Sequence, residues 1–107
     1  SLLTKRKITY HSFRKLASTK GMPVYTIYLF DIAFDLLNGE KKDALNRIAE
    51  FEKEFPNLQY YATTLRYIAN DFFSSDEQQI KKARKALLDS IDQYCLEALK
   101  KQNPPSA

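Results

Sequence analysis

LLNGEKKDALNRIAEFEKEFP, residues Leu36 to Pro56, carries a helix-ending signal at each side of an amphipathic run. Asn38 and Gly39 both tolerate positive φ and are typical of the residues that follow a helix. Pro56 disfavours helical geometry at the residue before it. Between these signals, apolar residues recur at three- and four-residue steps: Ala44, Ile48, Phe51 and Phe55. The stretch predicts the end of one helix, a tight turn, and a second helix over about 41–55.

Similar signals predict four more helices. In chain order they cover Thr9 to about Lys20, roughly 23–37, roughly 58–73, and a last helix that starts near Ser74 or Ser75 and continues to about Lys101. Residues 1–8 are expected to be a frayed lead-in. Ser74 with Glu77, or Ser75 with Gln78, has the spacing of a capping box for the last helix. The expected inward stripe of that helix is Ile80, Ala83, Leu87, Ile91, Tyr94 and Ala98, widened by Leu88 and Cys95.

The helix predicted over 23–37 is the most apolar in the chain and the best candidate for the centre of the core. Asp31 and Asp35 mark its polar side, whereas Phe30 and Phe34 lie off the main apolar stripe. The helix therefore has apolar surface on more than one side. Self-association is one hypothesis, on the premise that Phe30 and Phe34 have no partner within the chain.

Short loops between amphipathic helices make neighbouring helices antiparallel, so the second and third helices form one hairpin and the fourth and fifth another. Each hairpin has an apolar face too wide for one helix to cover, so the hairpins are expected to stack. The predicted fold is all-α, with about five helices in two stacked antiparallel hairpins, as an α-solenoid fragment or a small bundle. The predicted organisation is a basic lead-in and short helix (1–22), a helical-hairpin domain (23–101) and a disordered tail (102–107).

The first hairpin resembles the tetratricopeptide repeat. That family has a glycine at the turn between its helices A and B, an alanine five residues on and a proline twelve further, matched here by Gly39, Ala44 and Pro56. Tyr28 stands at the large aromatic position of helix A, and Ile48 at the next packing position of helix B.

The resemblance covers roughly one repeat, residues 25–58, and departs from the family pattern at Asp35 and Ile32. It implies a concave groove that holds an extended or helical peptide. Arg66 and Asn70, one turn apart on the predicted fourth helix, are candidates to grip a peptide backbone or carboxylate, with Tyr67 beside them. A protein or peptide partner is thus the first functional hypothesis.

Basic side chains form two clusters. Residues 1–22 carry six basic and no acidic side chains, whereas residues 23–107 carry 11 basic against 13 acidic ones. The candidates for contact with phosphate or an acidic partner are Lys5, Arg6, Lys7, Lys81, Lys82, Arg84 and Lys85. A nucleic-acid-associated regulatory module is therefore the alternative hypothesis. The competing interpretation is a solvated face, with the second cluster balanced by Asp76 and Glu77.

FRKLASTKGMPVYTIYLF, residues 13–30, resembles a helix-turn-helix in the spacing of Ala17, Gly21 and Ile27. A DNA-reading helix needs polar side chains that reach base edges. The second helix of this segment is instead strongly apolar. An ordinary helical corner within a core is the favoured interpretation.

Catalysis is not expected. His11 is the single histidine and Cys95 the single cysteine, so no multi-cysteine metal site exists and neither a metal nor a cofactor is predicted. Cys95 in an apolar helix is typical of a small buried hydrophobe, and acidic neighbours disfavour a thiolate in a Cys95–His11 pair. Two glycines 18 residues apart do not make a phosphate-binding loop.

The lone cysteine favours a reducing, intracellular compartment, cytoplasmic or nuclear. No apolar run has the length of a membrane span, so no membrane partner is expected. The chain begins at Ser1 without a methionine and is expected to be part of a longer protein. The leading hypothesis is a non-catalytic interaction module or scaffold within such a protein or complex.

Overall fold

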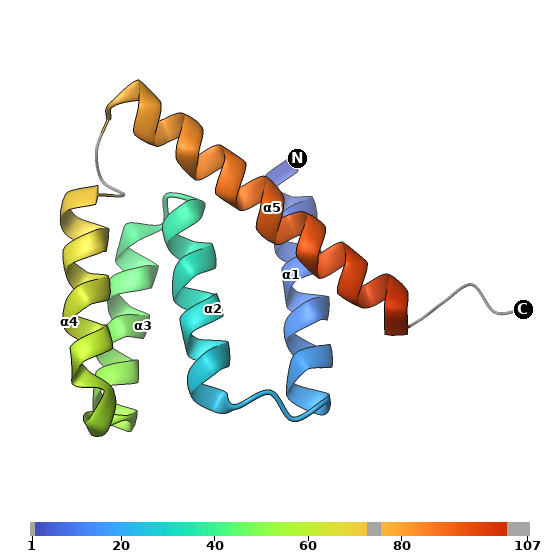
Figure 1. The fold of residues 1–107 in the computed structure, drawn as a ribbon, viewed down its shortest axis with the longest axis horizontal. Coiled ribbons are helices and arrows are strands. Elements are labelled where there is room, and N and C mark those ends of the chain that lie inside the picture. The colour runs from blue at the N-terminus through green and yellow to red at the C-terminus, as the bar shows by residue number, and fades with distance from the viewer. Residues whose placement is uncertain (1, 73–75, 103–107) are drawn as a thin grey trace, which may run out of the picture.

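The computed structural model describes residues 2–72 and 76–102, and these residues form five α-helices and no strand (Figure 1). The helices are α1 (Leu2–Thr19), α2 (Val24–Leu37), α3 (Lys41–Glu54), α4 (Gln59–Tyr67) and α5 (Gln78–Gln102). A 3₁₀ turn, η1 (Pro56–Leu58), precedes α4, and a π-helical turn, η2 (Ile68–Phe72), follows it. The predicted all-α class with about five helices is confirmed.

The turn between α2 and α3 has the chemistry expected of Asn38-Gly39. Gly39 has φ 77°, where a side chain would be strained, and its N–H donates to the Leu36 carbonyl at 3.1 Å. The Glu40 N–H donates to the Asp35 carbonyl at 2.8 Å, which completes a Schellman-type end. Gly21, with φ 86°, ends α1 in the same way. At the other end of α3, the helix stops at Glu54, just before Pro56.

Helix α1 begins at Leu2, so the expectation that residues 1–8 form a frayed lead-in is wrong. Ion pairs to distant helices hold the first turns in place. Arg6 bonds Asp89 of α5, and Lys7 bonds Glu40 before α3 with a nitrogen-to-oxygen distance of 2.6 Å. Because helix ends are stabilised mainly by tertiary contacts, these pairs extend the helix past its predicted start at Thr9.

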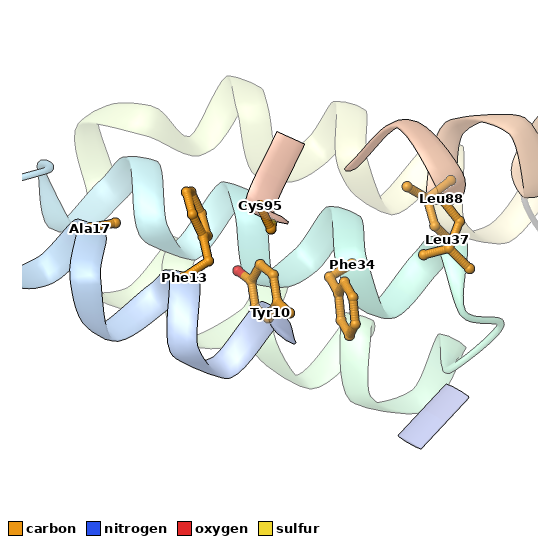
Figure 2. Close-up of a cluster of buried hydrophobic side chains, with 7 residues drawn as sticks. All are labelled: Tyr10, Phe13, Ala17, Phe34, Leu37, Leu88 and Cys95. Atoms are coloured by element: carbon orange, nitrogen blue, oxygen red, sulfur yellow. The ribbon is translucent and has the colours of Figure 1, made fainter. Parts of the chain in front are cut away.

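Two apolar clusters lie against opposite sides of α2. The cluster on the α4 side joins α2, α3, α4 and η2, and its buried members are Ile32, Leu36, Ala44, Ile48, Phe51, Ala62 and Ala69. The cluster on the α5 side joins α1, α2 and α5, and its buried members are Tyr10, Phe13, Ala17, Phe34, Leu37, Leu88 and Cys95 (Figure 2). The prediction that 23–37 is the central helix is therefore confirmed.

The partner of α5 differs from the expected second hairpin. Helices α2 and α3 pair as predicted, and α4 packs on α3, but α5 crosses over α1 and α2 instead of lying along α4 (Figure 1). The face of α5 that packs against the core is therefore rotated about the helix axis relative to the predicted face. Leu88 and Cys95 are buried, whereas Leu87 and Tyr94, expected to face inward, are about half exposed. Helix α5 packs against the aromatic side chains of α1, Tyr10 and Phe13. The apolar pattern of α5 alone does not indicate which helix it packs against.

Phe30 and Phe34 do have partners within the chain, so the premise of the self-association hypothesis is wrong. The Phe34 ring stacks on Tyr10 with 4.3 Å between ring centres, and Phe30 packs against Phe13 and Tyr94. Gln102, the first residue of the expected disordered tail (102–107), still belongs to α5. The rest of that tail and the proposed capping serines, Ser74 and Ser75, lie outside the described residues. None of the described helices combines the length and the apolar character that a bilayer span requires.

Candidate functional site

The outer face of α4 carries three tyrosines that project from the core. Tyr60 is 79% exposed and Tyr67, seven residues later on the same face, is 67% exposed. Tyr61 is half exposed, and its ring lies 6.1 Å from that of Tyr60. Tyr60, Tyr61 and Tyr67 are called the tyrosine face below. On the opposite side of α4, fully buried Ala62 allows a close approach to α3.

The three residues predicted to bind a partner do not share one environment. Tyr67 and Asn70 are both exposed, and Tyr67 belongs to the tyrosine face. Arg66 points toward α3, where its Nη2 atom donates to Glu52 at 3.0 Å. A partner group that engaged Arg66 would have to compete with Glu52. The structure thus groups Tyr67 with Tyr60, which the sequence did not single out, and separates Arg66 from them.

The two basic clusters come from helices that pack together, since α1 lies against α5. In the first cluster, Lys5 is exposed, whereas Arg6 and Lys7 are held by Asp89 and Glu40. In the second cluster, at the start of α5, Arg84 is half-buried. The three lysines of this cluster are exposed: Lys81, Lys82 and Lys85. The structure leaves these three lysines and Lys5 available to solvent.

A charged cleft of about 450 Å³ lies between α1 and α3, with α2 as its floor. Lys7, Tyr10, His11 and Arg14 line it from α1, and Asp43 and Arg47 line it from α3, with Glu40 just before that helix. Asp31, Phe34 and Asp35 form the floor. Sequence reasoning did not identify this site.

Asp31 and Asp35, predicted to mark the polar side of α2, are buried, at 4% and 6% exposure, and face the charged cleft. They are the only charged residues in α2, one helical turn apart, and both belong to the cleft. An i, i+4 pair of aspartates in an otherwise apolar helix was the available signal. This signal points to a buried charged site only once α1 and α3 are known to place arginines on both sides of the two aspartates.

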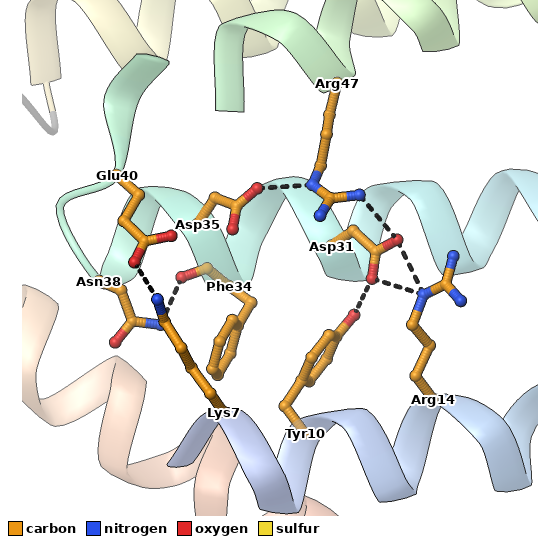
Figure 3. Close-up of polar contacts among 9 residues, drawn as sticks. All are labelled: Lys7, Tyr10, Arg14, Asp31, Phe34, Asp35, Asn38, Glu40 and Arg47. Carbon is orange, nitrogen blue, oxygen red and sulfur yellow. Dashed lines mark hydrogen bonds and ion pairs between the residues drawn. The ribbon is translucent and has the colours of Figure 1, made fainter. Parts of the chain in front are cut away.

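Asp31 accepts hydrogen bonds from α1 and forms an ion pair with α3 (Figure 3). The Tyr10 hydroxyl donates to Oδ1 at 2.5 Å, and Arg14 Nε lies 3.1 Å from Oδ1 and 3.0 Å from Oδ2. Arg47 Nη1 from α3 lies 3.6 Å from Oδ2. Burial, and then the hydrogen bond to Asp31, raises the pKa of Tyr10, so the phenol remains a donor. Charge-assisted bonds of this kind satisfy a carboxylate that would be costly to bury alone.

Asp35 accepts a bond from Arg47 Nε at 2.7 Å. Burial raises the pKa of Asp35, the bond to Arg47 opposes that rise, and the charges of Glu40 and Asp43 add to it. At the same end of the cleft, the hydrogen bond to Glu40 raises the pKa of Lys7. The cleft therefore has an acidic end around Asp35, Glu40 and Asp43, and a guanidinium-rich end around Asp31.

Cys95 and His11 occupy different surroundings. Cys95 is buried in the cluster on the α5 side, where burial, followed by the charge of Asp92, raises the pKa of the thiol to about 11. The thiol is thus protonated at neutral pH. His11 is exposed and lines the charged cleft. Within residues 2–72 and 76–102, no group of three or more His, Cys, Asp or Glu side chains is arranged to hold a metal ion.

Comparisons with known protein families, with curated proteins and with solved structures find no match to this chain. The functional interpretation consequently depends on the tyrosine face, the exposed lysines and the charged cleft.

Proposed function

We propose that this chain is a non-catalytic interaction module that binds a protein or peptide partner through the tyrosine face of α4. The supporting observation is the exposure of Tyr60 and Tyr67, at 79% and 67%, on one side of a helix that packs on α3 through the fully buried Ala62. Tyrosine is enriched at protein interfaces because it offers a large contact area with few rotatable bonds. Asn70 continues this surface and adds an amide for hydrogen bonds to a partner backbone.

The proposal includes tetratricopeptide-like packing of the first hairpin. Its support is the tight turn at Gly39 and the fully buried Ala44, which permits α2 and α3 to approach closely. In a repeat array, the outer side of α4 is a surface that a further element or a ligand would cover. The module then acts within a larger intracellular protein or complex. The protonated, buried Cys95 is compatible with a reducing compartment.

The test compares partner capture by two matched double variants. Tyr60→Ser with Tyr67→Ser removes the two most exposed members of the tyrosine face, and Lys100→Ser with Lys101→Ser alters an exposed pair on α5. Surface changes of this kind are expected to alter the free energy of unfolding by no more than about 0.5 kcal/mol, so both variants remain folded. Quantitative affinity capture from cell extract is expected to lose at least one protein with the tyrosine variant and keep it with the lysine variant. An identical set of captured proteins for both variants would contradict the proposal.

Once a partner is isolated, each tyrosine substitution alone is expected to weaken its binding by about tenfold, the size of a modest interface hot spot. Isothermal titration of the purified pair measures this change. Arg66→Ala is the informative comparison, because Arg66 is already paired with Glu52 and is expected to have a smaller effect. A larger effect for Arg66→Ala than for Tyr67→Ser would mean that the partner binds in the concave peptide groove predicted from the sequence and not on the tyrosine face.

The second candidate function is association with nucleic acid, favoured by the exposure of Lys81, Lys82 and Lys85 on the first turns of α5. Binding of this kind depends on phosphate contacts and weakens steeply with salt. An electrophoretic shift with duplex and single-stranded nucleic acid at two salt concentrations, repeated with Lys81→Glu and Lys82→Glu, tests it. The absence of a shift at low salt would remove this candidate.

A further inference from the structure

Helices α1 and α5 carry most of the positive charge of the chain. Together they contain 11 basic and three acidic side chains, a net charge of +8, whereas the rest of the chain contains six basic and ten acidic ones, a net charge of −4. Because α1 packs on α5, the structure brings this charge together, and α1 lies at the opposite end of the row of helices from α4 (Figure 1). A local excess of this size attracts an extended anion.

Exposed residues recur at three- and four-residue steps along α1 and so form its outer face: Lys5, Ile8, Ser12, Lys15 and Thr19. The opposite face of the helix packs in the core through Tyr10, Phe13 and Ala17. Neither of the two lysines forms an ion pair within the described residues, and α1 contains no acidic side chain. Solvated helix faces commonly mix both signs of charge, so a face with lysines alone favours an anionic partner.

Contacts with α5 add further lysines near both ends of α1. Near its start, Arg6 bonds Asp89, and the exposed Lys85 precedes Asp89 by about one helical turn. Near its end, Leu16 and Lys101 line a common cavity of about 290 Å³. The lysines therefore follow α1 over its 18 residues, which corresponds to about 27 Å. They are called the lysine strip below: Lys5, Lys15, Lys85 and Lys101.

Double-stranded nucleic acid matches the length and the chemistry of the lysine strip. A duplex rises about 3.4 Å per base pair, so the strip corresponds to roughly eight base pairs of backbone. Single-stranded nucleic acid is held largely by stacking of its bases on aromatic rings. Tyr94 is the only exposed tyrosine or phenylalanine on α1 and α5, whereas the other exposed tyrosines lie on α2 and α4. A membrane-surface helix needs an apolar face, whereas Ile8 is the only apolar member of the outer face of α1.

We propose that the lysine strip binds the phosphate backbone of double-stranded nucleic acid, with Lys5 and Lys15 of α1 as the principal contacts. The proposal rests on the second candidate function and extends it, because that candidate depends on the first turns of α5 alone. It is independent of the tyrosine face, which lies on α4. Contacts from lysine to phosphate fix the position of a duplex and do not select its base sequence.

The test is fluorescence anisotropy of the whole chain with a labelled DNA duplex of about 16 base pairs, twice the length of the strip, at a series of salt concentrations. Lys5→Gln with Lys15→Gln is expected to weaken binding about tenfold. The steepness of log K against log salt concentration is expected to fall by about two, one for each lost phosphate contact.

The matched control is Lys41→Gln with Lys42→Gln, an exposed pair at the start of α3 that changes the net charge by the same amount. It is expected to change the affinity by less than about twofold, because salt screens charges that do not touch the duplex. All four positions are exposed, so both variants are expected to remain folded, and circular dichroism checks this. Equal weakening by the two variants would mean that net charge, and not the lysine strip, holds the duplex.

Other results would also overturn the proposal. Tighter binding to a single strand of the same length, or to phosphatidylserine vesicles, would replace the duplex by another anion. Unchanged affinity in Lys5→Gln with Lys15→Gln, together with loss of binding in the glutamate variants of α5, would exclude α1 and leave the second candidate function in place. The absence of duplex binding at low salt would remove both. The variant with Tyr60→Ser and Tyr67→Ser should retain duplex binding, so partner capture by the tyrosine face is decided separately.

Discussion

The two apolar clusters on either side of α2 differ in how completely they exclude water. On the α4 side, Ile32, Ile48 and Phe51 have 0% exposure, and small Ala44 and Ala62 let the helices approach closely. On the α5 side, the buried members retain between 1% and 9% exposure, and three of the seven are aromatic: Tyr10, Phe13 and Phe34. The α4-side cluster joins sequential helices, whereas the α5-side cluster joins the two ends of the chain. Neighbouring helices with matched stripes thus make the drier core, and the oblique crossing of α5 leaves more surface open.

The largest expected effect comes from emptying the centre of the cluster on the α4 side. Phe51→Ala removes a ring with 0% exposure and is expected to lower the free energy of unfolding by about 3–5 kcal/mol. Urea denaturation followed by circular dichroism measures the loss. A loss below about 1 kcal/mol would mean that the cluster repacks and is not the more tightly packed of the two.

The matching change on the α5 side is Leu88→Ala. Leu88 is buried but keeps 6% exposure, so the expected loss is about 2–3 kcal/mol, the lower part of the range for buried leucine. Native-state hydrogen exchange is expected to show faster opening of α5 than of α3, because α5 packs through this cluster. Equal acceleration in both helices would mean that the clusters unfold as one unit.

Asp31→Ala tests the polar layer that faces the cluster on the α5 side. The substitution leaves the Tyr10 hydroxyl without its acceptor, whereas Arg14 and Arg47 are each nearly half exposed and can turn to water. The expected loss in free energy of unfolding is about 1–3 kcal/mol, measured by urea denaturation. Asp31→Asn retains an acceptor for Tyr10 and is the control, with a smaller expected loss. A larger loss for Asp31→Asn would contradict this account.

The smallest effect is expected at Asp35 and depends on pH. Burial raises the folded-state pKa of Asp35 above the ordinary value of 3.8, so the folded state binds this proton more tightly than the unfolded state. Stability linked to Asp35 is therefore fully present below pH 3.8 and is lost as the pH rises through the folded-state pKa. Asp35→Asn removes that dependence. The difference in free energy of unfolding between the two proteins, measured across this window, should shift in favour of Asp35→Asn as pH rises. A shift in the opposite direction would mean that Arg47 outweighs burial.

The first hairpin could be predicted because its signals are local. Gly39 takes the positive φ that its position requires, Pro56 stops α3 within a residue of the predicted end, and Ile48 and Phe51 face the core as their spacing indicates. Each of these outcomes depends on residues within one or two helical turns. Of the candidate site, the same reasoning identified Tyr67 and Asn70 but not Tyr60.

The rest depended on contacts between distant parts of the chain. The start of α1 at Leu2 requires Arg6 and Lys7 to meet acids on other elements, and the burial of Asp31 requires Arg14 and Arg47 from two other helices. The residue pattern of a single helix does not indicate which charged residues of other helices it will contact. The charged cleft was missed for this reason, since its walls come from three elements.

By itself, the amino-acid sequence determined that this chain is helical, where its central helices stop, and which face of α3 is apolar. Propensity, turn chemistry and periodicity act over a few residues, so they can be read one segment at a time. Only the tertiary structure decided that α5 crosses α1 and α2, that Leu87 and Tyr94 are half exposed while Leu88 and Cys95 are buried, and that two aspartates of α2 face a cleft. Those outcomes depend on which helix faces pack together. Several apolar and charged faces could cover the same surface, and the choice among them is made only when all the helices are packed together.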